Sequence, residues 1–260
     1  MSFANNNGVK IHYEVEGQGP PLVLQHGVTM SLNLWRVQGY TSALKDDYTL
    51  ILIDARGHGK SDKPHEPEAY TIEKMTGDVV AVLDVLGIGK TRYWGYSMGS
   101  MIGFQLLKQH PARFSSFVLG GMSPYPWQSK EEQDYIGLLR EVGGIGARGG
   151  AEAVISAFEK VGVVTEAWKQ QFRENDWVAI DAGFRGAAGW FLTDDVLVGC
   201  STPCFLYAGS LDPWFSGARR CAGVMRSASF MSVPGLEHGD TFDASASVLP
   251  RVKRFLSGVS

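Results

Sequence analysis

Short apolar runs alternate along the chain with longer segments in which apolar residues recur every three or four positions. Only the run at residues 9–15 alternates apolar and polar positions, as a strand with one solvated face does. The other runs are almost wholly apolar, which is typical of parallel strands covered on both faces. The predicted strands are residues 9–15, 21–25, 49–54, 91–96, 116–121, 203–209 and 228–233.

The segments between these runs have the spacing of amphipathic helices. In residues 72–87, apolar side chains recur at intervals of three and four, Thr71 can cap the first turn and Gly87 can end the last. A second helix is predicted from Met98 to the residue before Pro111. Strands that alternate with helices predict a mostly parallel sheet with helices on both faces.

The alternation stops in residues 123–195. This stretch has helical spacing without a strand-like run, and it holds four of the seven tryptophans. We therefore predict a helical cap of residues 123–195, inserted between two strands of a core domain formed by residues 1–122 and 196–260. The cap is expected to fold over the carboxyl edge of the sheet.

One segment of the cap, "GIGARG" at residues 144–149, matches the glycine pattern of dinucleotide-binding loops. That pattern requires a preceding strand, whereas the residues before it have helical spacing. We therefore interpret it as a flexible hinge of the cap, and we expect no cofactor.

Composition excludes several other classes of function. The 260 residues carry a net charge of −3 and no run of five basic residues, so a nucleic-acid partner is not expected. No charged and apolar leader and no apolar stretch of membrane-spanning length occurs, so we expect a cytoplasmic protein without a membrane partner. Cys200, Cys204 and Cys221 lack the spacing of a metal or redox motif and are expected to be buried free thiols. The oligomeric state stays open.

The pattern glycine-x-serine-x-glycine occurs at residues 95–99, and a chain with 32 glycines can produce it by chance. Its context is specific, because a predicted strand ends at Tyr96, Ser97 occupies the bend and a predicted helix begins at Met98. A serine hydroxyl needs exposure on such a turn and a neighbouring base to act as a nucleophile. Side chains at Gly95 and Gly99 would collide with the adjoining strand and helix.

Four further segments join this motif in an order that resembles the α/β-hydrolase superfamily over nearly the whole chain. These blocks are "LVLQHGV" (22–28), "LIDARGHGKSDKP" (52–64), "GYSMG" (95–99), "GSLDPW" (209–214) and "GLEHGD" (235–240). The resemblance implies an α/β-hydrolase fold with a helical cap and a serine nucleophile.

The resemblance also implies the partners of Ser97. His238 follows the last predicted strand, which is where the family has its catalytic histidine. With Asp212 as the acid, the residues occur along the chain in the family's order of nucleophile, acid and base. Asp194 and Asp195 are alternative candidates for the acid, but they precede the strand at residues 203–209 and so lie at the opposite edge of the sheet. The alternative role for Asp212 is that it only caps the next helix. Of the other histidines, His12, His65 and His110 are expected to face solvent, whereas the family blocks imply structural turns for His26 and His58.

An oxyanion intermediate needs preorganised donors. One is expected to be the backbone N–H of Met98 at the helix start, and the resemblance places the second at Val28. Glu237 departs from the family pattern, since many relatives have glycine before the histidine; we expect its carboxylate to point away. "QHGV" also differs from the glycine run of many lipases, so a bulky triglyceride is not the expected substrate.

A serine at this position excludes the relatives that use aspartate there, such as dehalogenases and epoxide hydrolases. The sequence therefore predicts a serine hydrolase that cleaves a small or medium apolar ester or lactone, without a metal. The alternatives are a small-molecule receptor that retains the triad, a carbon–carbon hydrolase and a cofactor-free perhydrolase. Arg148 and Arg185 are interpreted as solvated residues of the cap. The residues expected to contact substrate are Trp35, Tyr96, Trp127, Trp190 and Trp214.

Overall fold

The computed structural model describes residues 1–160, 164–187 and 189–259. Its centre is one eight-stranded sheet with the order β1-β2-β4-β3-β5-β6-β7-β8, in which β1, β2 and β4 pair antiparallel and all other neighbours are parallel. The strands are β1 (Ser2–Asn6), β2 (Val9–Gly17), β3 (Pro21–Gln25), β4 (Thr49–Ile53), β5 (Thr91–Tyr96), β6 (Phe114–Gly120), β7 (Cys204–Gly209) and β8 (Ala228–Val233).

The prediction of a mostly parallel sheet is confirmed, and the seven predicted strands all form. β1 was not predicted, because its sequence "SFANN" is short and polar and only Ala4 is buried. It pairs with β2 through a tight turn in which Asn7 and Gly8 both have positive φ, 51° and 91°. Asn-Gly is the sequence signal of such a hairpin, and it was overlooked.

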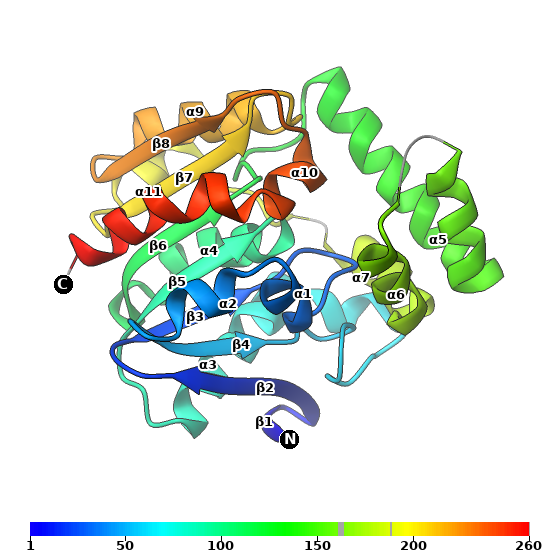
Figure 1. The fold of residues 1–260 in the computed structure, drawn as a ribbon, viewed down its shortest axis with the longest axis horizontal. Coiled ribbons are helices and arrows are strands. Elements are labelled where there is room, and N and C mark those ends of the chain that lie inside the picture. The colour runs from blue at the N-terminus through cyan, green and yellow to red at the C-terminus, as the bar shows by residue number, and fades with distance from the viewer. Residues whose placement is uncertain (161–163, 188, 260) are drawn as a thin grey trace.

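Helices cover both faces of the sheet (Figure 1). They are α1 (Leu32–Val37), α2 (Tyr40–Leu44), α3 (Ile72–Val85), α4 (Met98–Gln109), α5 (Lys130–Glu159), α6 (Glu166–Glu174), α7 (Trp177–Gly186), α8 (Asp194–Val198), α9 (Phe215–Val224), α10 (His238–Asp243) and α11 (Ser245–Ser257), with short 3-10 helices η1 (Pro67–Tyr70) and η2 (Pro111–Arg113). α3 begins after Thr71 as predicted, but the Thr71 side chain makes no capping hydrogen bond.

Alternate residues of each central strand belong to two different cores, since successive side chains of a strand point to opposite faces. On β4, Ile51 and Ile53 belong to the core that also contains side chains of α3, α4 and α9, whereas Leu50 and Leu52 belong to the core that contains side chains of α1, α2 and α11. Both faces of the sheet are therefore covered by apolar side chains. This double coverage is why the central strands read as almost continuous apolar runs.

The region between β6 and β7 is helical, as predicted. α5, α6 and α7 share a small core that includes Val142, Phe172 and Trp177. Figure 1 shows these helices beyond one end of the sheet. α8 runs past the predicted boundary at residue 195 and ends at Val198.

The segment 144–149 lies inside α5, in helical conformation, so no phosphate-binding loop forms there. The helix is interrupted one residue later, at Gly150 (φ 71°, ψ −172°), where the chain kinks. Within the described ranges, no helix combines the length and the apolar character that spanning a bilayer demands.

Candidate active site

Ser97 occupies the sharp turn between β5 and α4. Its φ of 52° and ψ of −115° lie in a region that side chains rarely adopt, a strain that costs about 1–3 kcal/mol. The Ser97 N–H donates a hydrogen bond of 2.9 Å to the Gly120 carbonyl on β6, which fixes the turn to the neighbouring strand. The chain is therefore held with Ser97 at the carboxyl end of the sheet.

The two flanking glycines allow this turn because the backbone passes too closely for any side chain. A Cβ at Gly95 would lie 2.3 Å from the Gly99 carbonyl oxygen, and one at Gly99 would lie 2.2 Å from the Gln25 carbonyl oxygen on β3. Both distances are far below van der Waals contact. The collisions expected from the sequence, with the following helix and with a neighbouring strand, are confirmed.

Ser97, His238 and Asp212 form a hydrogen-bonded chain. The His238 Nε2 lies 3.0 Å from the Ser97 Oγ, and the His238 Nδ1 lies 2.9 Å from the Asp212 Oδ2. All three residues are buried. Because a carboxylate only accepts hydrogen bonds, Nδ1 carries the proton and Nε2 presents its lone pair to the serine hydroxyl.

Asp212 lies in the turn between β7 and α9, and its two oxygens have separate tasks. Oδ2 contacts His238, while Oδ1 accepts the Trp214 backbone N–H at 3.0 Å. Asp212 therefore partners the imidazole and closes the turn before α9, but it does not cap that helix, whose N-cap is Trp214 and which has no capping hydrogen bond from a side chain. The rival Asp194 instead pairs with Arg220 on the surface, at 2.6 Å.

Aromatic rings hold the imidazole of His238 in place. The ring centroids of Tyr96, Tyr135 and Trp214 lie 5.4, 5.4 and 5.0 Å from that of His238. The buried Tyr96 hydroxyl also donates to the His238 carbonyl oxygen. Glu237 is exposed, and among the described residues its carboxylate makes no hydrogen bond or ion pair with His238.

Two backbone segments adjoin Ser97, the start of α4 and the loop after β3. Met98 is the first residue of α4, so its N–H has no acceptor within the helix. The loop that carries Val28 passes directly beside the serine, since a Cβ at Gly27 would lie 3.1 Å from the Ser97 Cβ. The next residue, Thr29, has a φ of 64°, and its N–H donates to His58 Nε2 at 3.3 Å.

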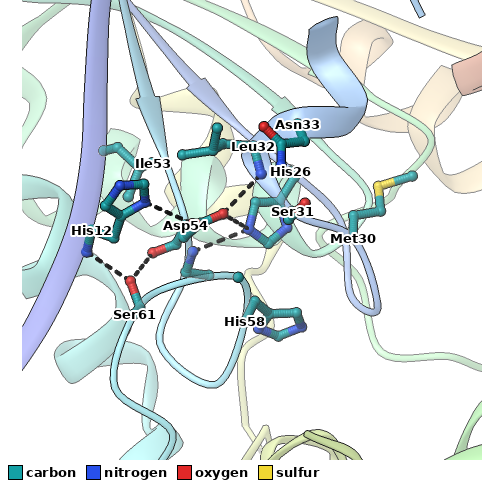
Figure 2. A network of polar contacts seen from close by, with 12 residues as sticks. His12, His26, Met30, Ser31, Leu32, Asn33, Ile53, Asp54, His58 and Ser61 are labelled. Atoms are coloured by element: carbon teal, nitrogen blue, oxygen red, sulfur yellow. Dashed lines mark hydrogen bonds and ion pairs between the residues drawn. The ribbon is translucent and has the colours of Figure 1, made fainter. Parts of the chain in front are cut away.

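Asp54, directly after β4, anchors the end of this loop by a hydrogen bond from Leu32 (Figure 2). The carboxylate accepts hydrogen bonds from His12 Nδ1 (2.8 Å), the Leu32 N–H (2.9 Å) and the Lys60 N–H (2.9 Å). Burial raises the pKa of Asp54, but these hydrogen bonds and the nearby His26 outweigh burial and lower it below its ordinary value. The expectation that His12 faces solvent is wrong: its ring is buried because it partners Asp54.

His26 and His58 are structural, as the resemblance implied. His26 Nδ1 donates to the Gly27 carbonyl at 2.7 Å, and Nε2 accepts the Ala55 N–H at 3.1 Å. Burial lowers the pKa of His26, and burial together with His26 lowers that of His58 to about 3. Both rings are therefore neutral near pH 7 and join the loops beside Ser97 by hydrogen bonds.

Ser97 contributes to the lining of two of the cavities formed by the described residues. The first, here called the methionine cavity, has a volume of about 70 Å³ and an almost wholly apolar lining. Its lining includes Val28, Met75, Ser97, Met98, Met101, Met122, Trp127, Arg140, Trp190 and Trp214. The second, here called the carboxylate cavity, has a volume of about 320 Å³ and is lined in part by Glu237, Asp240 and Asp243. Val28 and Ser97 border both.

Four of the five aromatic residues expected to contact substrate line one of these two cavities. Trp127, Trp190 and Trp214 line the methionine cavity, and Tyr96 lines the carboxylate cavity. Trp35 lines neither, and the prediction for it is wrong. Its fully buried indole packs against Tyr40, Trp94 and Phe242 in the core on one face of the sheet.

Sequence reasoning missed Met75, Met101 and Met122 in the methionine cavity, and Asp240 and Asp243 in the carboxylate cavity. Met75 comes from α3, Met101 from α4 and Met122 from the loop after β6, so no single segment gave a signal. Arg148 is exposed and Arg185 pairs with Asp181, as expected of solvated cap residues. Groups of three or more His, Cys, Asp or Glu side chains placed to bind a metal ion do not occur in the part of the chain that the structure describes.

Comparisons with known proteins support the fold. Residues 20–143 match the family model described as alpha/beta hydrolase fold. The chain is 36% identical over 115 residues to epoxide hydrolase 3 of Siraitia grosvenorii, and 31% identical over 137 residues to 3-oxoadipate enol-lactonase 2 of Acinetobacter baylyi. The matches cover 44% and 52% of this chain but only 36% and 50% of those proteins, so the chain spans half or less of their length.

A likeness over the whole chain comes from a solved structure. The enol-lactonase from Burkholderia xenovorans LB400 superposes with a TM-score of 0.82 and 25% identity, over 98% of this chain and 100% of the other. The sheet order and the strand-turn-helix motif at Ser97 fit the same assignment. The chain therefore has the α/β-hydrolase fold, and its sequence and structure are similar to those of α/β hydrolases.

Proposed function

We propose that this protein is a serine hydrolase that cleaves small carboxylic esters or lactones through an acyl-enzyme. The observation that carries the proposal is the hydrogen-bonded chain from Ser97 Oγ to His238 Nε2, at 3.0 Å, and from His238 Nδ1 to Asp212, at 2.9 Å. This is the arrangement in which a serine hydroxyl gains a base and the base gains an orienting carboxylate.

The chemistry follows from the positions of these groups. Ser97 Oγ attacks the carbonyl carbon and gives its proton to His238 Nε2, while Asp212 stabilises the imidazolium. The oxyanion forms beside the N–H groups of Val28 and Met98, our proposed donors. The acyl–oxygen bond then breaks, and the leaving alcohol takes the proton from His238. Water repeats the sequence on the acyl-enzyme, with His238 as base, and releases the acid.

Epoxide hydrolysis is disfavoured by the nucleophile, although an epoxide hydrolase is among the relatives. A serine that opened an epoxide would form an ether. An ether lacks the electrophilic carbonyl that water attacks in the second half of the cycle, so turnover would stop. The likeness to enol-lactonases instead fits acyl transfer.

The helices α5, α6 and α7 are proposed to act as a cap over this site. Tyr135 of α5 contacts His238, and Ile180 of α7 lines the methionine cavity. Asn175, directly after α6, donates to the Thr29 carbonyl at 2.9 Å. The cap therefore closes both cavities around a small substrate and limits the acyl group to one that fits the apolar lining.

Hydrolysis of short p-nitrophenyl esters tests the proposal. Relative to wild type, we expect Ser97→Ala to lower kcat by at least about 10³-fold and Asp212→Asn by about 10³–10⁴-fold. A fluorophosphonate probe should label wild type and the exposed-serine control Ser232→Ala equally, but not Ser97→Ala. Full turnover or labelling of Ser97→Ala would refute the proposal.

A further inference from the structure

The positions of the two cavities relative to His238 assign the two halves of an ester. The leaving oxygen must take its proton from His238 Nε2, so the alcohol must lie against both Ser97 and His238. The carboxylate cavity is lined by both residues, whereas the methionine cavity is lined by Ser97 but not by His238. A third cavity touches His238 and Asp212 without reaching Ser97. Of these three cavities, as the described residues line them, the carboxylate cavity alone meets both requirements for the alcohol, which leaves the methionine cavity for the acyl group.

The carboxylate cavity, which we assign to the alcohol, has a negatively charged lining. Glu237, Asp240 and Asp243 line it, and none of the described lining residues is a lysine or arginine. Glu237 and Asp240 are exposed and form no ion pair among the described residues, so their charges are not neutralised by the protein. Asp243, in contrast, accepts hydrogen bonds from Gln38 (2.7 Å) and Trp168 (3.1 Å).

Aromatic residues form part of the remaining wall of this cavity. Its aromatic lining residues are Tyr96, Tyr135, Phe158, Trp168 and Phe172. Aromatic faces attract organic cations, and the attraction grows when the cation loses water. Lys169, next to Trp168 on α6, does not oppose this field, because it is paired with Glu159 (2.8 Å) and Glu166 (3.2 Å). Carboxylates and aromatic faces in one cavity favour a positive charge.

We propose that the substrate is an ester with a compact apolar acyl group and a cationic alcohol, such as an amino alcohol or a quaternary ammonium alcohol. This inference rests on the proposed function, since it names the substrate class of the same site. The acyl group lies in the methionine cavity, and the cation lies between the aromatic wall and the carboxylates of Glu237 and Asp240. An anionic alcohol is rejected by the same charges.

A pair of isosteric esters tests this assignment. Choline butyrate and 3,3-dimethylbutyl butyrate have the same shape but differ by one positive charge, and acid release is followed by pH-stat. Each kcat/KM is divided by the rate constant of the ester with hydroxide, which removes the intrinsic reactivity of the leaving group. We expect the corrected ratio to favour the cation by about tenfold in wild type and to fall in 0.5 M NaCl.

The double variant Glu237→Gln/Asp240→Asn should reduce this ratio to about twofold, because the aromatic wall alone remains. The matched control Glu131→Gln removes an exposed carboxylate that lines the third cavity and should keep the wild-type ratio. A ratio near one in wild type, with the neutral ester hydrolysed, overturns the cationic-alcohol inference alone. Failure of wild type to hydrolyse either ester, or p-nitrophenyl esters, overturns the proposed function as well.

Discussion

Replacement of Asp54 tests the idea that one buried carboxylate holds the loops beside Ser97. Asp54 accepts three hydrogen bonds, from His12 and from the backbones of Leu32 and Lys60. A hydrogen bond to a charged group contributes about 1.5–3 kcal/mol, and a buried donor left without an acceptor costs about 1–3 kcal/mol. In Asp54→Asn, one amide oxygen can keep the His12 and Lys60 contacts, but the NH₂ then faces the Leu32 N–H. We therefore expect a loss of about 3 kcal/mol in the free energy of unfolding.

Equilibrium urea unfolding at pH 7 measures this loss, with unchanged m-values as evidence that the same surface is exposed. The control Asp46→Asn changes an exposed aspartate and should stay within about 0.5 kcal/mol of wild type. The pKa of Asp54 is lowered in the folded protein, so its stabilisation is present above the unfolded pKa and disappears as pH falls through the folded pKa. The difference in the free energy of unfolding between wild type and Asp54→Asn should therefore become smaller at acidic pH. A loss below about 1 kcal/mol at pH 7 would contradict the reasoning.

Two further substitutions test the turn and the correction for Trp35. Gly99→Ala places a Cβ 2.2 Å from the Gln25 carbonyl oxygen, so we expect at least about 3 kcal/mol of destabilisation or failure to fold. A stable and active variant would contradict this expectation and show that the turn can relax. Trp35→Phe should lower stability by about 1–2 kcal/mol but leave KM for p-nitrophenyl acetate within about twofold, because the indole lines neither cavity at Ser97. A large change of KM at unchanged stability would return Trp35 to the substrate site.

The fold was largely predictable because its signals are local. Seven strands were found as apolar runs, and the missed β1 contributes one buried side chain at the edge of the sheet. The candidate site was predictable in part for the same reason, since the turn at Ser97 requires glycines at fixed spacing. The prediction for His12 was wrong because the alternation along β2 predicts that this residue faces solvent. In the fold, β4 pairs with β2 and brings the Asp54 carboxylate next to the His12 ring, which is buried.

The sequence by itself determined the order of strands and helices, the strained turn at Ser97 and the chain order of Ser97, Asp212 and His238. Tertiary structure alone decided which cavity borders His238, which tryptophans face a cavity, and that Glu237 and Asp240 line a common space with Trp168. The reason is physical: backbone geometry and glycine requirements act over a few residues. A cavity is bounded by side chains from segments that are far apart in the chain, and their meeting depends on how the helices pack across the sheet.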